Sequence, residues 1–238
     1  MLKTLLFFFI SLIITVDAFA QYNFRRFSVG LGGGPNRPFS DVYTNKTGPT
    51  ATIYTDFYFT PFVVGGIEAQ IGSLRGGNRI TDPHLREFEN AHKTLLFTGK
   101  ISLGQLLNYN RRSFLNTIKG VYMGTGAGFM YNKMVFVTRI KPDGLNNYTF
   151  PGDDSGVNLV VPAMIGIAFN IDDAWDETRY IVSAGYQMNL TFGEGMDGFN
   201  DPPKVFENNF NDMYSYATLS VKYAFGRKGA FYRPFRYR

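Results

Sequence analysis

The sequence predicts an all-β chain that folds as a closed, antiparallel, eight-stranded transmembrane β-barrel with up-and-down connections. Three observations predict this fold. Apolar residues alternate at period two over eight stretches of about ten residues each, which indicates strands with two different faces. The face opposite the apolar one is small and polar and carries few charges. The connecting segments alternate between long and short, as in barrels whose long loops share one end.

The eight stretches cover most of the chain after residue 21 and are separated by segments rich in Gly, Pro, Asn and Asp, which favour turns. They are Phe24–Gly34, Thr50–Thr60, Phe62–Leu74, Thr94–Leu106, Lys119–Asn132, Val157–Ile171, Tyr180–Phe192 and Met213–Phe225.

The two faces of these stretches distinguish a membrane barrel from a soluble one. None of the apolar faces carries a charge, and their aromatic residues gather near the ends of the stretches, as in the girdles of membrane barrels. The opposite, polar face of a soluble barrel would meet water and carry many Lys and Glu residues. Here that face is small and largely uncharged, so we expect it to line a narrow lumen.

Five charges fall on the predicted lumen face. Because eight strands leave a lumen that side chains about fill, we expect a paired network that closes it and little or no conductance. The five residues are Arg26, Asp56, Glu68, Lys100 and Lys222.

Glycines at every second position of "VYMGTGAGFMY", namely Gly124, Gly126 and Gly128, lie on the same face as these charges. A dinucleotide loop would need a third glycine three residues after the second and a following helix, and a phosphate loop would need Gly-Lys-Ser or Gly-Lys-Thr. Neither pattern is present. We therefore interpret the three glycines as clearance inside a narrow barrel.

Both ends of the chain are predicted to differ from the barrel. A short basic start, an apolar run and the small residues at 18–20 are typical of a cleaved signal peptide at residues 1–20. The barrel is predicted at 21–226. Residues 227–238 form a basic, aromatic tail, predicted on the periplasmic side, that could contact peptidoglycan, an envelope protein or anionic lipid.

Three stretches of the sequence, each covering a predicted strand, resemble the outer-membrane β-barrel domains of Bacteroidetes, the broad OmpA/OmpX-like and PorT-like group. They are "NYNRRSFLNTIKGVYMGTGAGFMYNKM", "IVSAGYQMNLTFGEGMDGFND" and, above all, "NDMYSYATLSVKYAFG". The resemblance covers most of the chain after residue 20 and implies an outer-membrane location. Members of this group range from structural barrels to parts of secretion systems.

The sequence therefore predicts a non-enzymatic, monomeric outer-membrane protein, in contact with outer-membrane lipid, that has a structural or interaction role. No cofactor, metal or nucleic acid is expected. One alternative is a lipid-modifying hydrolase that uses His84 or His92, in the predicted second long loop, with Ser73 or Ser102. The other alternative, which the resemblance implies, is a secretion-system component that binds envelope proteins through its loops or tail.

Overall fold

The computed structural model describes residues 22–40, 42–105, 118–140, 149–175, 177–193, 195–200 and 212–231. The predicted signal peptide lies outside the described residues, as do residues 232–238 of the predicted tail. The strands are β1 (Tyr22–Phe39), β2 (Asn45–Lys46), β3 (Gly48–Thr60), β4 (Val63–Gly77), β5 (Glu87–Ser102), β6 (Val121–Val137), β7 (Ser155–Asp172), β8 (Thr178–Phe192) and β9 (Met213–Phe231), and a short 3-10 helix, η1, covers Leu103–Gln105.

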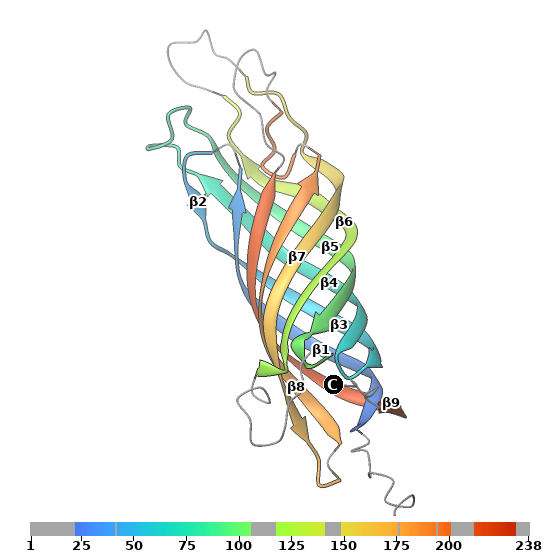
Figure 1. Cartoon of the computed structure of the whole chain (residues 1–238). Coiled ribbons are helices and arrows are strands. Elements are labelled where there is room, and N and C mark those ends of the chain that lie inside the picture. The colour runs from blue at the N-terminus through green and yellow to red at the C-terminus, as the bar shows by residue number, and fades with distance from the viewer. Residues whose placement is uncertain are drawn as a thin grey trace, which may run out of the picture.

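Eight of these strands close into a ring. Their order is β4-β3-β1-β9-β8-β7-β6-β5, every neighbouring pair is antiparallel, and β4 pairs with β5 to close the sheet. β2 pairs with the end of β4 next to the β4–β5 connection and lies in line with β3. The predicted eight-stranded antiparallel barrel is confirmed. The β1–β3, β4–β5, β6–β7 and β8–β9 connections share one end of the barrel, here called the long-loop end, and β1 begins at the other, here called the short-turn end (Figure 1). The predicted alternation of long and short connections holds only in part, because residues 103–120 between β5 and β6 belong to the short-turn end and outnumber residues 78–86 between β4 and β5.

Each predicted stretch lies almost wholly within one strand of the ring, and the largest difference is in β5. This strand begins at Glu87, seven residues before the predicted start at Thr94. Phe88, Asn90 and His92 are buried at alternate positions, so the two-face pattern continues. The outward residues there are charged or small rather than apolar, which hides the pattern from a search for apolar alternation.

The burial pattern is the reverse of that in a soluble protein. Outward apolar side chains such as Leu31 and Leu219 are 67% and 69% exposed, whereas the inward residues Thr52, Gln70 and Asn189 are almost fully buried. Among the described residues, no helix has the length and apolar character needed to cross a membrane.

The long-loop end of the lumen is filled by an apolar cluster, here called the plug. Strand residues of this cluster pack with loop residues from the β1–β3, β6–β7 and β8–β9 connections. The plug comprises Val42, Leu74, Phe88, Leu96, Met130, Phe150, Val160, Met196, Phe199 and Tyr214.

At the short-turn end, β9 continues past the predicted barrel boundary at residue 226. Lys228 to Phe231 pair with Arg25 to Tyr22, so residues 227–231 extend the sheet rather than begin a separate tail. The register shifts next to Gly226, whose φ of 86° places it in the left-handed region. An extra residue on β9 at this position is a β-bulge, which a glycine accommodates without strain.

Candidate functional site: the barrel interior

Four inward side chains from four strands form a buried quartet of charges in the half of the lumen near the short-turn end. Lys222 Nζ on β9 donates to Asp56 Oδ2 on β3 at 2.5 Å, and Lys100 Nζ on β5 donates to Glu68 Oε1 on β4 at 2.6 Å. The lysine side chains are 8% and 12% exposed and both carboxylates are 1% exposed. The quartet is electrically neutral, which is what makes its burial tolerable.

Aromatic rings surround the two ammonium groups. The ring of Tyr54 lies 4.5 Å from Lys222 Nζ and 5.4 Å from Lys100 Nζ, and Tyr122 lies 5.9 Å from Lys100 Nζ. These distances permit cation–π attraction in a site largely removed from water. Tyr54 stands two residues before Asp56 on β3 and therefore has the same facing, but sequence reasoning connected no aromatic residue with the charges.

Glycines stand opposite three members of the quartet in the strand register. Gly30 faces Lys222, Gly66 faces Asp56 and Gly124 faces Lys100. A Cβ at residue 30 would lie 2.6 Å from Lys222 Cγ, and one at residue 124 would lie 2.9 Å from Lys100 Cγ. The close approach of each charged stem therefore depends on the missing side chain across the strand pair.

Gly126 and Gly128 also face inward positions of β5, opposite Thr98 and Leu96. A Cβ at either position would collide with a backbone carbonyl oxygen of β5. The three glycines that sequence reasoning interpreted as clearance thus line one continuous stretch of the β5–β6 contact.

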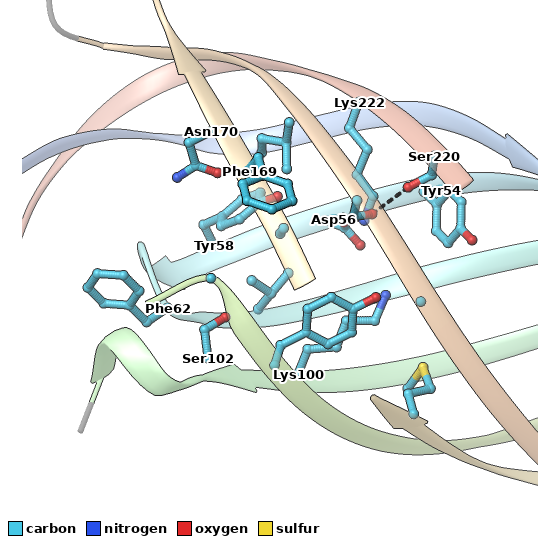
Figure 2. Close-up of a pocket in the computed structure, with 18 of the residues that line it drawn as sticks. Tyr54, Asp56, Tyr58, Phe62, Lys100, Ser102, Phe169, Asn170, Ser220 and Lys222 are labelled. Carbon is cyan, nitrogen blue, oxygen red and sulfur yellow. Dashed lines mark hydrogen bonds and ion pairs between the residues drawn. The ribbon is translucent and has the colours of Figure 1, made fainter. Parts of the chain in front are cut away.

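A cavity of about 390 Å³ adjoins the quartet and extends toward the short-turn end. Tyr54, Tyr58 and Tyr122 contribute to its wall, and the turn residues Pro61 and Phe62 line its outer part. Figure 2 shows Asp56, Lys100 and Lys222 around this space, with Phe62 at one side. The plug lies toward the other end of the lumen, so the cavity is a recess rather than a passage through the described part of the barrel.

Arg26 is not part of the quartet. It is exposed, and among the described residues no ion pair involves it. Its neighbour Arg25 instead binds Glu177 at 2.9 Å. The reason is position: Arg26 lies beside the bulge at Gly226, beyond the level at which the barrel encloses a lumen.

His92 lies inside the barrel on β5, rather than in a loop as predicted. Its Nδ1 is 3.2 Å from Thr94 Oγ1, its Nε2 is 3.4 Å from Thr50 Oγ1, and its ring packs on Tyr214. Ser102 lies on the same strand ten residues away, about 33 Å at 3.3 Å per residue.

Among the residues that the structure describes, neither His84 nor His92 belongs to a recognisable catalytic or metal site. Ser73 lies on the outward face of β4, between the inward positions Gly72 and Leu74, whereas His92 lies on the inward face of β5. His84 does lie in a loop, next to Phe150, and its backbone amide donates to Asp82 Oδ1 at 2.8 Å. In the described part of the chain, no three His, Cys, Asp or Glu side chains are grouped to hold a metal ion.

The comparisons with known proteins return solved structures only. Neisserial surface protein A matches 84% of this chain and 97% of its own at 10% identity, with a TM-score of 0.46. The attachment invasion locus protein Ail of Yersinia pestis, in complex with a heparin analogue, matches 84% and 99% at 13% identity, with a TM-score of 0.42. The outer membrane protein OprG of Pseudomonas aeruginosa matches 85% and 98% at 10% identity, with a TM-score of 0.36. No protein-family model and no curated protein matches the chain.

Proposed function

We propose that this chain is an integral outer-membrane protein with a filled, non-conducting lumen, and that it acts structurally or through contacts made by its exposed ends. The apolar outer face carries this proposal. Large apolar side chains are exposed on the outside of every strand of the ring, whereas the charged residues Asp56, Glu68 and Lys222 are buried inside it. Only a hydrocarbon surrounding favours that arrangement, because water would penalise the outer face.

The height of this face supports the proposal. On β6 the outward residues between Val121 and Tyr131 are uncharged, and Lys133 follows. Ten residues at about 3.3 Å each, tilted by about 40°, span about 25 Å, which is the height of the apolar band of outer-membrane barrels. On this interpretation the long-loop end faces outward and the short-turn end faces the periplasm, as in barrels whose two termini lie in the periplasm.

The filled lumen supports a non-conducting barrel. The plug occupies one end, and the quartet is neutral and spans the lumen between β3, β4, β5 and β9. No described arrangement of serine, histidine and carboxylate favours the hydrolase alternative.

Two measurements test the proposal. The protein refolded in detergent or lipid should migrate faster on a gel before heating than after it, since folded barrels resist unfolding by the gel detergent. In planar lipid bilayers the inserted protein should show no stable conductance steps. Fractionation with soluble periplasmic proteins would refute membrane insertion, and stable conductance steps would refute the filled lumen.

A further inference from the structure

A continuous row of six aromatic rings covers one side of the barrel at the short-turn end, across β8, β9, β1 and β3. Successive ring centroids lie 5.0 to 6.4 Å apart. The rings, here called the aromatic row, are Tyr180, Tyr223, Phe225, Phe27, Phe57 and Phe59. Outward positions at the same end of β4, β5 and β6 are Gly65, Ile101 and Val121, so the row does not reach that side of the barrel. On β7, Ile171 stands opposite Tyr180, and the ring of Phe169 is exposed two residues before it.

Trp175, the sole tryptophan of the chain, stands beside this row in the turn between β7 and β8. Its side chain is 81% exposed. The turn that presents it is held by hydrogen bonds: Asp173 Oδ1 accepts from the amides of Trp175 and Glu177, at 2.9 and 3.1 Å. Asp173 thus holds the backbone at Trp175 and at Glu177, which lowers the entropic cost of binding through the tryptophan.

Ion pairs and hydrogen bonds tie the turn to the aromatic row. Arg179 donates to Asp173 Oδ2 at 2.8 Å and reaches the hydroxyl of Tyr223 at 3.5 Å. Glu177 binds Arg25 of β1 and Lys228 of β9. The turn, the row and the paired ends of β1 and β9 thus form one surface, here called the periplasmic rim.

The periplasmic rim has an excess of positive charge. Among the described residues, five cations, Arg25, Arg26, Arg179, Arg227 and Lys228, stand against three carboxylates, Asp172, Asp173 and Glu177. Asp176, which lies between Trp175 and Glu177 in the sequence but outside the described residues, lowers the difference from two to one. Arg25, Arg179 and Lys228 are paired. Arg26 and Arg227 are exposed, and no ion pair within the described ranges involves them. These two arginines flank Phe27 and Phe225 of the row.

We propose that the periplasmic rim binds the headgroups of anionic phospholipids in the adjoining membrane leaflet. The inference rests on the proposed membrane insertion and deepens it. Amphipathic aromatic rings favour the level of the headgroups, where one end of the ring meets hydrocarbon and the other meets water. Trp175 stands five residues from Tyr180, at most about 17 Å by chain length, so its side chain can reach the headgroup layer. Guanidinium groups bind phosphate through paired hydrogen bonds.

The lone tryptophan permits a direct test. The full chain is refolded into vesicles of phosphatidylcholine containing equal fractions of brominated phosphatidylglycerol or brominated phosphatidylcholine, and quenching of Trp175 emission is compared. Quenching by the anionic lipid should exceed quenching by the zwitterionic lipid at least twofold. The variant Arg26→Gln/Arg227→Gln should lower the ratio of the two quenchings to nearly one, because it removes the two cations that attract the anionic headgroup.

A matched control carries Lys93→Gln/Lys133→Gln, which removes two exposed cations near the long-loop end. This variant should keep the full anionic preference. Equal quenching by both lipids in a barrel that passes the heat-modification test would overturn the lipid proposal alone. Absence of quenching in such a barrel would also overturn it and favour a periplasmic protein as the partner. Failure to form a heat-modifiable barrel would overturn both the proposed function and this inference.

Discussion

Removal of one lysine from the charge quartet should destabilise the barrel strongly. In Lys222→Met the aliphatic stem is kept and the ammonium is lost, so Asp56, which is 1% exposed, loses its partner at 2.5 Å. Breaking a buried pair by removing one partner typically costs 3–5 kcal/mol. Because the cavity next to Asp56 can admit water and Ser28 Oγ lies 3.5 Å away, we expect the lower end, about 3 kcal/mol.

The assay is urea unfolding in lipid vesicles, followed by the heat-modifiable gel shift. The double variant Asp56→Asn/Lys222→Met removes both charges and should recover most of the loss, because no buried ion is left unpaired. The control Lys93→Met changes an exposed lysine on the outward side of β5 and should shift the free energy of unfolding by less than about 0.5 kcal/mol. Equal stability of Lys222→Met and the unmodified protein, or a double variant less stable than the single one, would refute the ion-pair reasoning.

Three further predictions concern other parts of the molecule. Gly126→Ala should destabilise the barrel by about 1–3 kcal/mol in the same assay, because the new methyl group meets backbone, whereas Gly156→Ala has no atom within 4 Å and should be nearly neutral. His92→Ala should leave the mass spectrum of lipid A unchanged in cells and lower only stability, since the ring fills space; an altered spectrum would restore the hydrolase hypothesis. A hydrogen bond from the neighbouring guanidinium lowers the pKa of Asp173 from its ordinary value of 3.8. A group whose pKa is lowered by folding stabilises the fold at pH values above its ordinary pKa. This contribution is lost as the pH falls through the pKa that the group has in the folded protein. The fluorescence anisotropy of Trp175 should therefore stay constant from pH 7 to about 4 and fall only at lower pH; a decline near neutrality would contradict this.

The strands could be predicted because their outer face is apolar at every second residue. That criterion depends on the hydrocarbon surroundings, and it fails where a strand continues beyond them. The first seven residues of β5 alternate just as regularly, but Glu89 and Lys93 replace the apolar partners, so His92 looked like part of a loop. A search for the inward face alone, on which Phe88, Asn90 and His92 recur at every second position, would have found the extension.

The pairings within the lumen could not be predicted, because they depend on the stagger of the closed sheet. Sequence assigns Asp56, Glu68, Lys100 and Lys222 to one face but does not say which carboxylate meets which lysine. Asp56 and Lys222 are 166 positions apart and belong to strands that are not neighbours, since β1 lies between β3 and β9. The placement of Arg26 in the lumen network differs from the structure for a related reason. An alternating pattern shows neither the bulge beside Arg26 nor the level at which the enclosed lumen ends.

The position of the glycines explains how the lumen holds charges at all. A long side chain that crosses a narrow barrel needs space at its own strand pair, and across from Lys100 and Lys222 that space is provided by Gly124 and Gly30. If either glycine carried a side chain, the lysine stem would move and its ammonium would lose the carboxylate that neutralises it. Gly124 of β6 and Gly30 of β1 are thus a steric condition for the buried ion pairs, and a glycine substitution opposite a lysine should couple energetically with removal of that lysine. The double variant Gly124→Ala/Lys100→Met should therefore be less destabilised than the sum of its two single variants, whereas Gly126→Ala/Lys222→Met, whose sites lie on separate strand pairs, should be additive within about 0.5 kcal/mol.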